Sequence, residues 1–348
     1  MKYFIIIFSL LVLGCSGSNS SSTTVKLEGA PAPFDGSKKV HFALIRQMVE
    51  GEFMQMWQDG AQKQADLMGI QLTVFGKNMD NQAQADFVYQ AINMKVDGII
   101  LDHGLTETLA KPAADAVAAG IPVVAFDVDV QNPEINQIAQ DDYALGRMAL
   151  DAMNKDYNQK ANIGYVYFAG ILPLDKRDRA FTEFKKEFPN MKEIARTGTV
   201  ESPFSVKNAE QVKAILKSNP EINAYFAPYD EFAKGVVLAL DEEGLNDKIR
   251  VYSADISTQD IELIIKEGSP WAATAATSPR LIGALSVRAL ALKIAGEDLP
   301  DDILITPTLF TQDMLKEANV KNMEDLQAKF PEFNKTTNMT ADWIPMAE

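Results

Sequence analysis

Short apolar runs alternate with longer amphipathic segments from Lys38 onward, and this alternation predicts the secondary structure. In Glu52–Met68, for example, Phe53, Trp57 and Ala61 recur at helical spacing and would give a helix one apolar face. The first series predicts strand Val40–Ile45, helix Glu52–Met68, strand Gln71–Phe75, a helix marked by Ala83, Phe87, Ala91 and Met94, strand Gly98–Leu101, helix Leu105–Ala119 and strand Pro122–Phe126. Such repetition is typical of a parallel sheet covered on both faces.

A second series begins after a helix near Asp141–Lys155. It predicts strand Asn162–Phe168, helices Lys176–Phe188 and Val206–Ser218, strand Ala224–Ala227, helix Asp230–Glu243, strand Arg250–Ser253, helix Thr258–Glu267, strand Ala272–Thr277 and helix Ser278–Ile294. Two series predict an α/β fold with two doubly wound parallel-sheet lobes. Ligands of open α/β sheets bind outside the carboxyl ends of the strands, so we expect a cleft between the lobes. After Phe310 we expect an irregular tail that packs along the second lobe.

The N-terminus has the pattern of an export signal. Lys2 is followed by the apolar run Tyr3–Leu13, which is too short to span a membrane, and then by Gly14 and Cys15. Cys15 is the only cysteine, so the pattern resembles a lipobox, in which its thiol is acylated; an ordinary signal peptide is the alternative. We predict a signal peptide over residues 1–14, a flexible Ser-rich and Pro-containing tether over 15–37, and a membrane-anchored protein of the periplasm or cell envelope.

Composition narrows the function classes. The chain is 47% hydrophobic and 23% charged, as expected for a water-soluble globular protein, and the part after the tether is long enough for two domains. Its formal net charge of −15 disfavours nucleic acid as a partner, because an acidic surface repels phosphates. No second apolar segment of spanning length follows, so we expect membrane contact only through the lipid anchor.

The sequence lacks the motifs of several enzyme classes. It contains no Gly-rich phosphate loop after a strand and no G-x-S-x-G elbow. His41 and His103 are the only histidines, too few for a typical zinc site; His103 follows a strand end, where it either lines the cleft or lies in a solvated loop. We therefore expect no cofactor, no metal and no catalysis, although carboxylates alone leave acid–base chemistry open.

Several strand-end segments together resemble the type 1 periplasmic sugar-binding proteins, the family of the ribose- and galactose-binding proteins. The segments that carry the resemblance lie between Val40 and Phe310. They are Asp59-Gly60-Ala61, Val96-Asp97-Gly98-Ile99-Ile100, Gly120-Ile121-Pro122-Val123-Val124 before Asp127, and Asp230-Glu231-Phe232-Ala233 before Gly235. The resemblance implies two lobes joined by a three-stranded hinge. The first lobe would comprise residues 38–141 and 278–305, and the second would comprise 142–277 and 306–348, including the C-terminal tail.

The same resemblance implies a set of ligand-binding residues in the first lobe. Phe53 matches an aromatic residue that packs on the apolar face of the sugar, although it could equally be a core residue of its helix. Met54 replaces a second aromatic residue, and Gln47 matches a polar position after the first strand. Asp102 and Asp127 end two strands, where a carboxylate can accept hydrogen bonds from adjacent hydroxyls.

In the second lobe, Arg177 matches the family arginine and offers forked donors to sugar oxygens. Phe204 fits a second flanking ring, and Asp255 a second strand-end carboxylate. The remaining predicted ligand-binding residues are Tyr229, Asp230 and Thr277.

Three departures from the family pattern bear on the ligand. Val128 stands where the family often has Arg, Tyr229 stands where Asn usually precedes the Asp230-Glu231 pair, and Thr277 stands where Gln is expected near the hinge. These changes remove hydrogen-bond donors and add a bulky phenol. We therefore expect a different pentose, a deoxysugar or a polyol in place of ribose.

The resemblance implies a solute-binding lipoprotein that captures a small neutral monosaccharide or polyol between its lobes and delivers it to the permease of an ABC importer. Two other functions stay open at this point. One is a ligand-sensing receptor subunit for chemotaxis or a sugar-derived signal, which neighbouring permease genes would argue against. The other is a glycosidase that uses Asp127 and Asp255.

Overall fold

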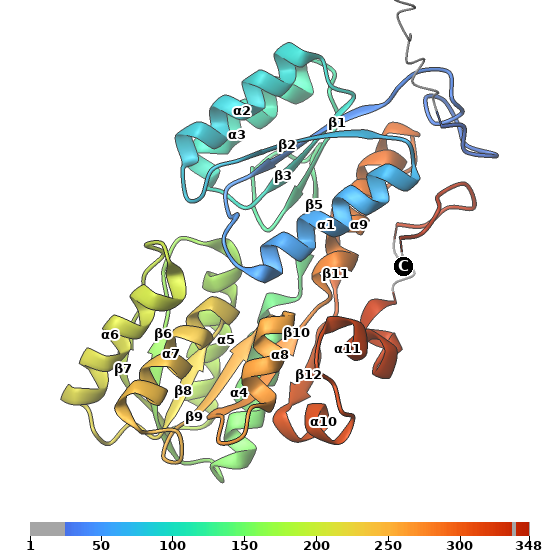
Figure 1. Cartoon of the computed structure of the whole chain (residues 1–348). Helices are drawn as coiled ribbons and strands as arrows, with labels where there is room; N and C mark the ends of the chain where they lie inside the picture. Colours follow the sequence, from blue (N-terminus) through green and yellow to red (C-terminus); the bar gives the residue numbers. More distant parts are fainter. Residues whose placement is uncertain (1–24, 336–338, 348) are drawn as a thin grey trace, which may run out of the picture.

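The computed structural model describes residues 25–335 and 339–347, and within them the chain forms two six-stranded sheets, each covered by helices (Figure 1). The strand orders are β11-β5-β4-β3-β1-β2 and β12-β10-β9-β8-β6-β7. All pairings are parallel except that of β10 with β12. The expected α/β fold with two doubly wound sheets is confirmed.

The strands of the first sheet are β1 (His41–Arg46), β2 (Gln71–Gly76), β3 (Gly98–Asp102), β4 (Val123–Phe126), β5 (Asn136–Gln140) and β11 (Asp302–Ile305). Those of the second are β6 (Ala161–Val166), β7 (Met191–Thr197), β8 (Ala224–Ala227), β9 (Arg250–Ala254), β10 (Trp271–Ala276) and β12 (Thr308–Thr311). The helices are α1 (Glu52–Leu67), α2 (Asn81–Met94), α3 (Thr106–Ala118), α4 (Asp142–Asp156), α5 (Leu172–Glu187), α6 (Phe204–Ser218), α7 (Asp230–Glu243), α8 (Thr258–Ile265), α9 (Pro279–Ile294), α10 (Gln312–Glu317) and α11 (Met323–Lys329), followed by the 3-10 turn η1 (Pro331–Asn334).

Helices α1 and α9 pack against each other on one face of the first sheet, and α2 and α3 cover the other face (Figure 1). The contact between α1 and α9 depends on two glycines. A Cβ atom at Gly60 would lie 2.1 Å from the carbonyl oxygen of Arg280, and one at Gly283 would lie 1.9 Å from that of Trp57. Any larger residue would therefore push the two helices apart.

The chain passes between the two sheets three times: between β5 and α4, between β10 and α9, and between β11 and β12. As a result, each sheet is assembled from segments that are distant in the sequence. The arrangement places the carboxyl ends of β1, β3 and β4 opposite those of β8 and β9 (Figure 1).

Both ends of the described chain differ from the expectation. Phe34, which falls in the predicted tether, is buried and stacks on Trp343 with a ring distance of 5.1 Å. The folded part therefore begins before Lys38. The segment after Phe310 is not irregular, because it contains α10 and α11, which begin at the side-chain caps Thr311 and Asn322.

The end of the tail also packs differently from the expectation. The side-chain amide of Gln64 on α1 donates a hydrogen bond to the carbonyl of Pro345 at 2.6 Å. The last described residues thus contact the first sheet's helix layer, while α10 packs on the second sheet. Residues 1–24, including Cys15, lie outside the described part, and within that part no helix is long and apolar enough to cross a membrane.

Candidate functional site

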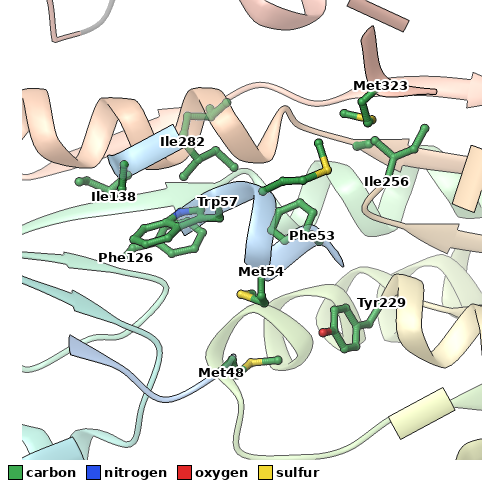
Figure 2. Packing of buried hydrophobic residues seen from close by; sticks show 14 of the residues in the cluster. Met48, Phe53, Met54, Trp57, Phe126, Ile138, Tyr229, Ile256, Ile282 and Met323 are labelled. Atoms are coloured by element: carbon green, nitrogen blue, oxygen red, sulfur yellow. The ribbon is translucent and has the colours of Figure 1, made fainter. Parts of the chain in front are cut away.

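A small cavity lies between the carboxyl ends of the two sheets. The first sheet and α1 contribute one wall, and the second sheet and α5 contribute the other. Figure 2 shows Met48, Met54 and Tyr229 gathered at one end of the buried cluster. The cavity is lined by Met48, Phe53, Met54, His103, Gln140, Ile171, Pro173, Leu174, Arg177, Tyr229 and Asp255.

Three polar residues at this edge have left-handed backbone conformations. His103, Asp127 and Asp255 each follow a strand directly and have φ values of 56°, 53° and 74°. Asp and His enter this region more readily than most residues, but it still has a cost in backbone energy. The conformation turns the chain sharply at the strand end, so that all three side chains are held near the cavity.

Arg177 is the centre of a buried ionic network on the second-sheet side. Its guanidinium donates to both carboxylate oxygens of Asp255 at 2.7 and 3.1 Å, to Asp142 Oδ1 at 3.1 Å and to the carbonyl of Pro228 at 2.7 Å. Burial alone would lower the pKa of Arg177, but the carboxylates of Asp255 and Asp142 raise it above its ordinary value. Arg177 is therefore a fixed cation whose planar group is oriented by the forked pairing.

Asp127 and Asp142 carry the unfilled acceptors of the site. Within the described residues, both carboxylate oxygens of Asp127 and Oδ2 of Asp142 are buried without a hydrogen-bond partner. Burial, followed by the negative charge of Asp142, raises the pKa of Asp127 to about 8. Burial also raises the pKa of Asp142, although Arg177 opposes this effect. Buried acceptors of this kind cost free energy until a donor, such as a hydroxyl, reaches them.

Asp102 lies behind the cavity and holds His103 in place. Its Oδ1 lies 2.6 Å from His103 Nδ1, and its Oδ2 accepts a hydrogen bond from Arg46 Nε at 2.7 Å. Burial would raise the pKa of Asp102, but Arg46 and His103 together lower it. Burial would lower the pKa of His103, but Asp102 raises it. His103 Nε2 lies 3.9 Å from Asp127 Oδ2, so the ring faces the unfilled carboxylate.

The opposite part of the cavity is apolar. Met48 follows β1, and Met54 lies in the first turn of α1. Ile171, Pro173 and Leu174 form the start of α5, where Pro173 is compatible with the first turn because its missing N–H would have no helical partner. These side chains are almost fully buried and carry no polar group apart from two thioethers.

The predicted site residues occupy different positions relative to the cavity. Those that line it are Phe53, Met54, Arg177, Tyr229 and Asp255. Asp127 lies beside His103, and Asp102 lies behind it. The others lie farther out: Gln47 donates to Asn81 Oδ1 at 2.5 Å, Phe204 packs against Tyr229, Thr277 donates to Gln140 Oε1, and Asp230 lies 3.8 Å from the ammonium group of Lys234.

Sequence reasoning missed several residues of the site. Gln140 and Asp142 flank the end of β5, a strand with only two apolar residues that gave no periodic signal. The apolar residues at the start of α5 were also missed. Their grouping directly after the Ala169-Gly170 turn concentrates apolar side chains at the start of a helix, and this was the available signal.

The two sides of the cleft are in direct contact. The Glu50 carboxylate accepts hydrogen bonds from the backbone N–H of Phe204 at 2.6 Å and from the Ser202 hydroxyl. Glu52 Oε2 accepts another from the backbone N–H of Gln259 at 2.8 Å. Since Glu50 and Glu52 belong to the first-sheet side and their partners to the second, the cleft is closed. In the part of the chain that the structure describes, no group of acidic, His or Cys residues could hold a metal ion.

Comparison with known proteins identifies relatives over most of the chain. Residues 42–298 match the family model described as the periplasmic binding protein domain. The ribose import binding protein RbsB of Haemophilus influenzae is 25% identical over 266 residues, which cover 76% of this chain and 89% of that protein. RbsB of Escherichia coli is 26% identical over 257 residues, covering 73% and 85%.

Solved structures give stronger matches. The 5-methylthioribose transporter solute-binding protein of Thermotoga lettingae, in complex with 5-methylthioribose, is 35% identical with a TM-score of 0.86, covering 88% of this chain and 97% of that protein. A sugar ABC transporter protein of Yersinia enterocolitica is 32% identical with a TM-score of 0.85, covering 88% and 93%. These relatives are named as binding or transport proteins, and none of the four is named as an enzyme.

Proposed function

Because the chain belongs to the periplasmic binding protein family, among its type 1 sugar-binding members, we propose that it is the lipid-anchored solute-binding component of an ABC importer and that its ligand is a pentose with an apolar substituent. The observation that carries the proposal is the division of the cavity. On one side, the unfilled carboxylates of Asp127 and Asp142 lie next to the lining residues His103 and Arg177, and the other side of the cavity is apolar.

The polar side suits the hydroxyls of a small sugar. Asp127 and Asp142 have buried oxygens that need donors, and Nε2 of His103, which faces Asp127, offers a donor to a ring or hydroxyl oxygen, while Arg177 holds Asp142 and Asp255 in place. Adjacent hydroxyls on a pentose can donate to one carboxylate and accept from the neighbouring imidazole. Hydrogen bonds to charged groups contribute about 1.5–3 kcal/mol each, so a few of them give tight binding when the cleft closes.

The apolar side of the cavity favours a pentose that carries an apolar substituent. Met48, Ile171 and Leu174 offer no donor or acceptor to a terminal hydroxyl, which would be buried there at a cost. A methylthio group or a deoxy carbon would bury apolar surface instead. The relative from Thermotoga lettingae, whose structure is a complex with 5-methylthioribose, supports this class of ligand.

The test is calorimetric titration of refolded, ligand-free protein with ribose, 5-deoxyribose, 5-methylthioribose and xylitol. We expect 5-methylthioribose to bind at least about tenfold more tightly than ribose, because burial of the substituent adds roughly 1.5 kcal/mol. Met48→Gln should reduce that preference, while Met314→Gln on α10, whose side chain is partly exposed outside the cavity, should leave it unchanged. Equal or tighter binding of ribose would contradict the apolar-substituent proposal.

Two further experiments address the rest of the proposal. Turnover of chromogenic glycosides by the purified protein would overturn the assignment as a binding protein. The lipid anchor rests on Gly14-Cys15 after the apolar run, so Cys15→Ser should move the exported protein from the membrane fraction to the soluble fraction. Retention of this variant in the membrane fraction would argue against acylation of Cys15.

A further inference from the structure

Arg288 on α9 is a buried cation that lacks a counter-charge. Its side chain is fully buried, and no acidic group of the described residues forms an ion pair with it. Nε and Nη2 have no hydrogen-bond partner, and Nη1 contacts only the sulfur of Met346 at 3.1 Å. A thioether is a weak acceptor, so most of the hydrogen-bonding capacity of the guanidinium is unused. Most buried arginines in proteins are paired, because an unpaired buried charge is costly.

The surroundings of Arg288 are hollow. A surface depression beside it is lined by α9, by the segment 304–308 that joins β11 to β12, by η1 and by Met346 and Ala347. In Figure 1 this region lies where β11 leads into β12, beside α11. Because β11 belongs to the first sheet and β12 to the second, the depression spans one of the three passages between them. It shares no lining residue with the cavity that contains Arg177.

The depression also contains a second positively charged group. Lys335 lines the same space, and its ammonium group is paired only with the exposed carboxylate of Glu332 at 2.8 Å. An adjoining depression, which shares Leu281 and Asn334 with this one, contains Lys63 and Arg280. Positive groups therefore gather here on a chain whose formal net charge is −15.

We propose that Arg288 anchors a binding site for a small oxyanion, a carboxylate or a phosphate, at the passage from β11 to β12. A planar oxyanion edge can accept from Nε and Nη2 together, which is the forked pairing that guanidinium favours. Met346 covers the group, and because its side chain is 42% exposed it can move aside to admit the anion. The site is separate from the sugar cavity, and burial, which lowers the pKa of Arg288 to about 10, leaves the group charged at neutral pH.

Occupation of this site would bear on sugar binding. The depression is bounded by α9 on one side and by η1 and β12 on the other, so an anion held there contacts both halves of the molecule. If it binds the closed form more tightly than the open form, it raises the affinity for the sugar, and the sugar raises the affinity for the anion by the same factor.

The experiment is a thermal-unfolding series of the full mature protein with sodium phosphate or sodium acetate, with sodium chloride at equal ionic strength as the reference. We expect one or both oxyanions to raise the melting temperature of the wild type in a saturable way. Arg288→Met should abolish that rise and should itself be as stable as the wild type in chloride, because an apolar side chain replaces an unpaired charge. Arg250→Met, which removes an exposed arginine from the second sheet, should retain the full response.

Two additional variants test the anion site without relying on Arg288→Met. Met346→Ala removes the cover and should strengthen anion binding measured by calorimetry, even if Arg288→Met does not fold. Glu348→Gln, at a residue outside the described part, tests whether the side-chain carboxylate of Glu348 fills the site. A phosphate response that appears only in this variant would overturn the proposal of an external ligand. An equal response in wild type and Arg288→Met, or none in either, would overturn the site altogether, whatever the sugar titrations show.

Discussion

Asp127 provides the sharpest test of the electrostatics of the cleft. Its carboxylate is buried without a partner, and its pKa is raised to about 8 from an ordinary value of 3.8. In the ligand-free folded protein the group is therefore protonated at pH 6, whereas in the unfolded chain it is ionised. Folding then takes up a proton, and the stability that this group contributes is fully present below pH 4 and is lost as the pH rises towards 8.

The magnitude follows from the pKa difference. One pKa unit corresponds to 1.36 kcal/mol, so the free energy of unfolding should fall by about 2 kcal/mol between pH 6 and pH 8 because of Asp127 alone. The total over the full range has an upper bound of about 6 kcal/mol. Asp127→Asn has nearly the same shape but no proton to lose, so this part of the pH dependence should disappear.

The assay is urea unfolding of ligand-free protein, followed by tryptophan fluorescence at several pH values from 5 to 9. The stability difference between Asp127→Asn and the wild type should shift in favour of the variant by about 2 kcal/mol from pH 6 to pH 8. Asp247→Asn, at an exposed position, should follow the wild-type curve. Parallel curves for Asp127→Asn and the wild type would refute the reasoning, because they would mean that Asp127 has a similar pKa in the folded and unfolded states.

Three other changes test separate parts of the structure. Arg177→Lys should weaken sugar binding by about 100-fold in calorimetry, because an ammonium group cannot reproduce the forked pairing with Asp255, and an unchanged affinity would contradict the role of that pairing. Glu50→Gln should weaken binding by about fivefold and increase the open fraction seen by small-angle scattering, since charge-assisted bonds across the cleft become neutral ones. Gly283→Ala should lower the free energy of unfolding by about 3 kcal/mol in urea titration, and a neutral effect would mean that α1 and α9 separate easily.

Much of the fold was predictable because the buried parallel strands have strong local signals. β3, with the sequence Gly-Ile-Ile-Leu-Asp, is apolar along nearly its whole length, as expected for a strand covered on both faces. By contrast, β7 is an edge strand with the sequence Met-Lys-Glu-Ile-Ala-Arg-Thr, and its polar residues concealed it. The helices after Phe310 were missed because α10 and α11 have only six and seven residues, too few for a helical period to be visible.

The residues of the candidate site likewise divide into those that the local sequence predicts and those that it does not. Asp127, Asp255 and His103 could be placed near a cleft because each directly follows an apolar strand, which is a local feature of the sequence. The pairing of Asp102 with Arg46 could not be predicted, because it depends on the register of β1 against β3. The roles assigned to the predicted ligand-binding residues, and the division of the chain into two lobes, stay predictions that the mutations above and ligand-bound structures can test.

The interlocked glycines of α1 and α9 have a consequence for how the molecule opens. Since the close approach at Gly60 and Gly283 leaves no space for α1 to slide along α9, the two helices must move as one rigid pair. This rigid pair carries Phe53 and Met54 at one end, and α9 starts directly after the chain passes from β10 of the second sheet to the first. Opening should therefore move the two helices as one rigid body. The surface that they present to the sugar would then be formed before any ligand binds.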